Sequence, residues 1–81
     1  MTRRLPRTLW LDADVKITIK QEPPSMIEAR YGEKGKAGFS DFPSKSIHID
    51  RTLSRVRKWK VLRHELIHML IDISAAVDGG L

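Results

Sequence analysis

Three side chains that can do chemistry lie close together in the segment VLRHELIHMLID, residues 61–72: His64, Glu65 and His68. On a helix, residues four positions apart lie about 40° apart around the axis and one turn above each other. The imidazoles of His64 and His68 can therefore converge on one ion, and histidine pairs at this spacing suit zinc. We predict that these two residues are metal ligands.

Glu65 follows the first histidine and projects about 100° around the helix from it. Its carboxylate can then reach a water on the metal without binding the metal itself. Zinc lowers the pKa of such a water, and a carboxylate beside it can take the proton and pass it to a leaving amine. We predict that Glu65 is the general base of an amide hydrolysis. The alternative interpretation is a pair of histidines held by hydrogen bonds in a core.

The helix that carries these residues is expected to run from Thr52 or Ser54, either of which can cap it, to about Ala76. No proline or glycine interrupts this range, and two glycines follow it. One side of the helix forms an apolar stripe: Trp59, Leu62, Leu66, Leu70 and Ile73. Three more apolar residues occupy much of the remainder: Ile67, Met69 and Ile71. We therefore expect a mostly buried helix with one narrow polar face.

The remaining elements are expected to be short strands. Residues 8–20 alternate between apolar and polar side chains, which predicts a strand, or two antiparallel strands if residues 12–14 form a turn. Residues 37–40 and 45–50 predict two further strands joined by a turn at 41–44.

Pro23 and Pro24 end the first β segment, because neither can donate to a strand ladder. Ser25 with Glu28 three residues later has the form of a capping box, which predicts a short helix to Arg30. The elements together predict one α+β domain over residues 1–81, with a small antiparallel sheet packed on one long helix.

Composition limits the class of protein. Eighty-one residues make one small domain, and the absence of cysteine excludes disulfides and thiolate ligands. His68 and Asp72 interrupt the longest apolar run, which is too short to span a membrane. The basic N-terminus lacks the apolar stretch of a signal peptide. We expect a soluble, cytoplasmic protein.

The formal net charge is +5, and the range 51–63 contains six basic residues and no acidic one. These residues are Arg51, Arg55, Arg57, Lys58, Lys60 and Arg63. They could contact an anionic partner such as nucleic acid, or they could be a solvated helix face flanking a buried seam. No nucleic-acid-binding motif accompanies them.

The segment HELIH followed by MLID resembles the active-site helix of zincin metallopeptidases, in particular the thermolysin-type (gluzincin) pattern H-E-L-x-H-x-x-x-D. GFSD, IHID and VLRHELIH also follow one another as in the small ImmA/IrrE-like metallopeptidase domains of bacteria and phages. The resemblance covers roughly residues 38–72. It implies a zinc-dependent peptidase acting on a peptide or protein substrate, with His64 and His68 as ligands and Glu65 as base.

The same resemblance implies that the strand SIHID is the edge along which an extended peptide adds itself, through Ile47, His48 and Ile49. His48 could face the site or lie on the surface. Asp72 could orient the ring of His68, or it could be a plain helix-surface residue. Three residues are candidate donors to the developing oxyanion: Tyr31, His48 and Arg63.

The third metal ligand is not evident. A catalytic zinc normally has three protein ligands and a water, and the gluzincin pattern draws its third ligand from a glutamate on a downstream helix. The chain ends at Leu81; Asp72 and Asp78 are the remaining candidates. We expect the third ligand to come from a longer natural chain, and residues 1–81 alone to bind zinc incompletely and to be a poor enzyme.

Overall fold

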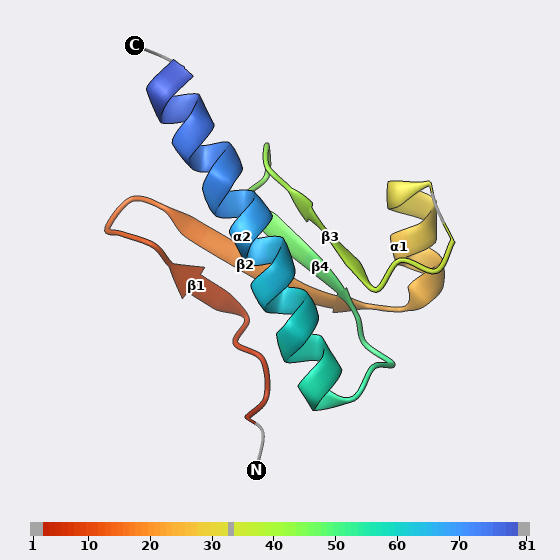
Figure 1. Cartoon of the computed structure of the whole chain (residues 1–81). Helices are drawn as coiled ribbons and strands as arrows, with labels where there is room; N and C mark the ends of the chain where they lie inside the picture. Colours follow the sequence, from red (N-terminus) through yellow and green to blue (C-terminus); the bar gives the residue numbers. More distant parts are fainter. Residues whose placement is uncertain (1–2, 33, 80–81) are drawn as a thin grey trace.

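The computed structural model describes residues 3–32 and 34–79, and the side chains of the last helix as far as Ala76. The elements in chain order are β1 (Thr8–Trp10), β2 (Lys16–Glu22), α1 (Pro24–Tyr31), β3 (Gly38–Asp41), β4 (Ser46–Asp50) and α2 (Arg55–Gly79). The four strands form one sheet, and the long helix α2 packs against it (Figure 1). The predicted α+β class is confirmed.

The strand order is β1-β2-β4-β3. β1 pairs with β2, and β3 with β4, in antiparallel fashion, but β2 and β4 run parallel. The prediction of an antiparallel sheet is therefore wrong for the central pair. Short turns make the two hairpins antiparallel. The chain instead reaches β4 from β2 through α1 and β3, and this crossover brings β4 back in the direction of β2.

The first hairpin confirms the prediction of two strands separated by a turn. Asp12 Oδ1 accepts hydrogen bonds from the backbone N–H groups of Asp14, at 2.7 Å, and Val15, at 2.9 Å. An aspartate that binds the backbone two and three residues later stabilises a turn by itself.

Helix α1 begins differently from the prediction. Its N-cap is Pro23, no side chain caps it, and Pro24 occupies the first turn. The capping box of Ser25 and Glu28 is therefore wrong. Proline suits the first helical position because its fixed φ is already helical and the N–H it lacks would have no partner in the helix. Gly32, with φ of 81°, ends the helix in the left-handed conformation.

The core lies between α2 and one face of the sheet. Its main residues are Ile17, Ile19, Ile47, Ile49, Leu62 and Met69. Ser54 Oγ accepts the N–H of Arg57 at 3.3 Å, which identifies Ser54 as the cap of α2. The apolar residues that alternate along β2 and β4 therefore pack against one side of α2 only.

The outer side of α2 is uncovered, and the C-terminal end of the helix extends beyond the strands (Figure 1). Ile67 is 59% exposed and Ile71 is 60% exposed. The expectation of a mostly buried helix is therefore wrong, because the sheet covers a single side of it. Within the described ranges, neither helix is both long enough and apolar enough to cross a membrane.

Candidate active site

Helix α2 places the two histidines as the spacing predicts. The Nε2 atoms of His64 and His68 lie 3.1 Å apart, and both side chains are exposed to solvent. A tetrahedral zinc ion with bonds of about 2.0–2.1 Å holds two nitrogen ligands about 3.3 Å apart. The separation of the two nitrogens therefore fits a shared zinc ion.

The described residues supply no complete set of ligands. No group of three histidine, aspartate or glutamate side chains in this part of the chain is placed to hold one metal ion. Asp72 lines a cavity with both histidines but does not complete such a group. The side chain of Asp78 lies outside the described residues. The expected source of the third ligand, a longer chain, stays a prediction.

Glu65 lies between the histidine pair and strand β3. The side chain is half-buried, and this burial raises the pKa of its carboxyl above the usual value. Four groups oppose the shift without cancelling it: the charges of His64, His68 and Lys36, and a backbone hydrogen bond from Ser40. A carboxylate whose pKa is raised toward neutrality is a better general base near neutral pH.

Strand β3 is the edge of the sheet beside the site. The N–H of Asp50 binds the carbonyl of Ala37 at 2.8 Å, so the backbone of Ala37 faces β4. Backbone direction alternates along a strand, and hence the N–H and C=O groups of Gly38 and Ser40 point away from β4 to the free edge. This alternation explains how the Ser40 backbone reaches the carboxylate of Glu65.

The expected substrate edge, strand β4, is not an edge. β4 pairs with β2 on one side and with β3 on the other, so its backbone groups are occupied. Ile47, His48 and Ile49 therefore cannot take up an additional strand. Ile47 and Ile49 are core residues, fully buried under α2. The free edge beside Glu65 belongs to β3.

His48 neither faces the site nor lies on the surface. It is 1% exposed, on the face of the sheet away from α2, and its ring stacks on Phe39 with centroids 4.5 Å apart. Nδ1 is hydrogen-bonded to Glu22 Oε1, and Nε2 lies 3.0 Å from Ser46 Oγ. His48 is thus part of a buried polar network, and it is excluded as an oxyanion donor.

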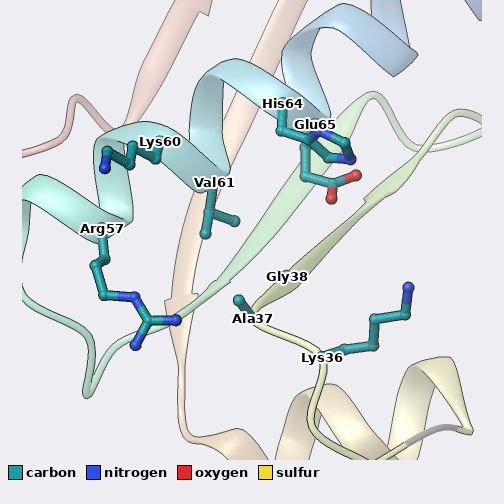
Figure 2. A pocket seen from close by; sticks show the side chains of 8 residues that line it. All are labelled: Lys36, Ala37, Gly38, Arg57, Lys60, Val61, His64 and Glu65. Carbon is teal, nitrogen blue, oxygen red and sulfur yellow. The ribbon is translucent and has the colours of Figure 1, made fainter.

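A groove lies between α2 and β3. It comprises two adjoining cavities of about 360 and 250 Å³, which share Lys36, Gly38, His64 and Glu65 in their walls. We call it the α2–β3 groove. At one end it is lined by Arg57, Lys60 and Val61, which lie on the part of α2 that precedes His64 and Glu65 (Figure 2). At the other end it is lined by Tyr31, His68 and Asp72, among others.

The groove separates the remaining oxyanion candidates. Tyr31 lines it, whereas Arg63 lines neither of its cavities. Lys36 also lines the groove, and the sequence did not predict it as a site residue. Its Nζ lies 5.0 Å from the centre of the Tyr31 ring. In the sequence, Lys36 lies just before a predicted strand. This position does not show which element the strand packs against, so it does not indicate that Lys36 lies at the site.

The basic residues of the range 51–63 do not form one surface. Arg57 and Lys60 line the α2–β3 groove. Arg55 and Lys58 line a separate cavity of about 310 Å³ together with Arg4, Leu5, Arg7 and Gln21. Four of the six basic residues of this range are therefore divided between two separate cavities.

Comparison of the chain with protein-family models, with curated proteins and with solved structures finds no match. The chemistry of the site is therefore the basis for the function proposed below.

Proposed function

We propose that this chain is a zinc-dependent metallopeptidase domain in which His64 and His68 bind the metal and Glu65 is the general base. One observation carries the proposal: two histidine Nε2 atoms lie 3.1 Å apart, with the half-buried Glu65 beside them in a groove along a free strand edge. A bound zinc ion would lower the pKa of a water and polarise a carbonyl oxygen.

The role of Glu65 follows from its surroundings. The Ser40 backbone N–H restrains the carboxylate, and burial raises its pKa, so the group can accept a proton and later release it to the leaving amine. The charges of His64, His68 and Lys36 oppose this rise in the pKa. Tyr31, whose side chain lines the same groove, is the candidate hydroxyl donor to the oxyanion.

The substrate is proposed to be an extended peptide that pairs with β3. Gly38 directs its backbone groups to the free edge, and the carbonyl of Ser40 points there as well, while the Ser40 N–H is bonded to Glu65. A peptide strand can pair with these groups by adding to the sheet. Such pairing would run the peptide past Glu65. The absence of cysteine fits a reducing compartment, and we propose a cytoplasmic location.

The decisive test compares Glu65→Gln with His64→Ala. Glu65→Gln should keep the zinc affinity of the wild type and lose hydrolysis of a peptide library, whereas His64→Ala should lose both. Zinc is measured by calorimetry and hydrolysis by mass spectrometry, with a zinc supplement in excess. Hydrolysis that survives Glu65→Gln, or zinc binding that survives His64→Ala, would contradict the proposal.

A second candidate function is binding of a polyanion such as nucleic acid. The observation that favours it is the cavity lined by Arg4, Arg7, Arg55 and Lys58. Binding driven by phosphate contacts weakens steeply as salt is raised, so a titration of DNA binding against salt concentration tests it. Absence of DNA and RNA binding at low salt would exclude this function.

A further inference from the structure

We propose that the basic end of the α2–β3 groove recognises an acidic side chain of the bound peptide, so that the site prefers substrates with aspartate or glutamate beside the cleaved bond. The inference deepens the proposed function and rests on it for the cleavage step. The recognition itself is a binding property and can be measured without hydrolysis.

The side chains that line this end of the groove are mainly basic, small or apolar. Three basic side chains line it: Arg57 and Lys60 from α2, and Lys36 from the segment before β3 (Figure 2). Among the residues that the structure describes, Glu65 is the only acidic one in the lining of this cavity. The remaining wall is small or apolar and comprises Ala37, Gly38 and Val61. A carboxylate entering here meets more positive than negative charge, next to a surface that excludes water.

Two of these cations have no ion-pair partner among the residues that the structure describes. In the described part of the chain, neither Arg57 nor Lys60 forms an ion pair with a carboxylate. Lys36 already acts on Glu65 and lies over the Tyr31 ring, so it contributes charge while keeping these contacts. Arg57 and Lys60 are therefore the residues assigned to the incoming carboxylate.

The spacing of residues along α2 is close to the spacing of alternate residues in an extended peptide. Val61 precedes Glu65 by four residues, which is one helical turn or about 6 Å. Alternate residues of an extended peptide are about 6.6 Å apart and point to the same face of a sheet. A peptide paired with β3 whose cleaved bond lies beside Glu65 therefore places an alternate side chain beside Val61, close to the turn that carries Arg57 and Lys60.

A peptide fits this groove better than a nucleic acid does. The Glu65 carboxylate stands in the cavity wall and would repel a phosphate chain running through it. The edge-facing backbone groups of Gly38 and the edge-facing carbonyl of Ser40 match a peptide strand. The basic residues Arg55 and Lys58 of α2 line a separate cavity.

The experiment measures binding to the full chain carrying Glu65→Gln, so that hydrolysis cannot consume the ligand. The probes are a fluorescent ten-residue peptide with two glutamates and the same peptide with glutamines in their place. We expect the acidic peptide to bind about tenfold more tightly at low salt. The double substitution Arg57→Gln with Lys60→Gln should remove this preference.

The matched control is Arg51→Gln with Arg63→Gln, which removes the same charge from residues that line neither end of the groove. This control should leave the preference for the acidic peptide within about twofold of that of the Glu65→Gln chain. Circular dichroism establishes that both double variants are folded.

The possible results separate the inference from the proposed function. Equal binding of the two peptides, binding of neither, or equal weakening by both double variants would overturn the inference. Stronger binding of single-stranded DNA than of the acidic peptide, lost in the Arg57→Gln, Lys60→Gln variant, would also overturn it in favour of nucleic acid. A clear preference for the acidic peptide without any hydrolysis by the wild-type chain in excess zinc would support the inference and count against the peptidase function.

Discussion

Gly38 of β3 and Val61 of α2 approach so closely that a Cβ built on Gly38 would lie 2.8 Å from Val61 Cγ1 and 2.5 Å from the carbonyl oxygen of His48. Only glycine leaves this space, and the close contact sets α2 against the free edge of the sheet. One turn later on the same helix stands Glu65. The approach of the two elements thus determines how far the carboxylate lies from the Ser40 backbone.

Substitution of Gly38 by alanine should therefore lower the free energy of unfolding by about 1–3 kcal/mol, because the added methyl must displace a backbone carbonyl as well as a side chain. Chemical denaturation measures this loss. Adding Val61→Ala should restore part of the stability and no more, since the His48 carbonyl remains in place. Unchanged stability of Gly38→Ala would show that α2 and β3 are packed less tightly than described.

The pKa of Glu65 predicts a dependence of stability on pH. Burial raises this pKa in the folded state above its ordinary value. The native state then binds more protons than the unfolded state, and the stabilisation linked to Glu65 is present at acid pH and is lost as pH rises through the raised pKa. Glu65→Gln cannot ionise, so its stability relative to the wild type should increase between pH 4 and pH 7.

Denaturation of both proteins in the presence of a chelator tests this dependence, because the chelator removes any contribution from metal. A constant difference in unfolding free energy across the pH range would mean that Glu65 is not desolvated. The same shift predicts that hydrolysis rises with pH as Glu65 ionises.

Much of the fold could be predicted from the sequence, because residue periodicity reports local structure. The alternation of residues 8–20 predicted β structure, with a hairpin as one of two alternatives, and the uninterrupted range up to Ala76 predicted α2. The parallel pairing of β2 with β4 could not be predicted in this way, since it depends on the path of the chain through α1 and β3. The assignment of the free edge to β4 failed for the same reason.

In the site, too, only residues that are close in the sequence could be predicted to lie together. His64, Glu65 and His68 are neighbours on one helix, so their spacing alone brought them together. Lys36 and Ser40 reach the groove from another element and carry no local signal. His48 lies on the face of β4 opposite Ile47, because side chains alternate along a strand. The sequence could not show that Phe39 and Glu22 cover that face.

The burial of His48 yields a prediction that distinguishes a structural from a catalytic role. His48→Ala would remove one hydrogen-bond partner from Ser46 and one from the mostly buried Glu22, which would keep Ser44 and Arg30, respectively, and we expect a loss of roughly 2–4 kcal/mol of unfolding free energy. Zinc binding should be unchanged once the variant is folded. A variant of wild-type stability with altered zinc affinity would contradict the assignment of His48 to the core network.

The incomplete set of metal ligands predicts weak binding of zinc. His64 and His68 supply two nitrogens at a spacing that suits zinc, but no group of three ligands exists among the described residues. Two ligands hold zinc weakly compared with the three of a catalytic site. The chain should therefore lose its zinc on gel filtration in metal-free buffer, and its hydrolysis should need zinc in excess. Atomic emission measures the retained metal, with His64→Ala as the reference for nonspecific binding. Retention of one zinc per chain would show that a third ligand is present, and loss of that retention in Asp78→Asn or Asp72→Asn would identify the ligand.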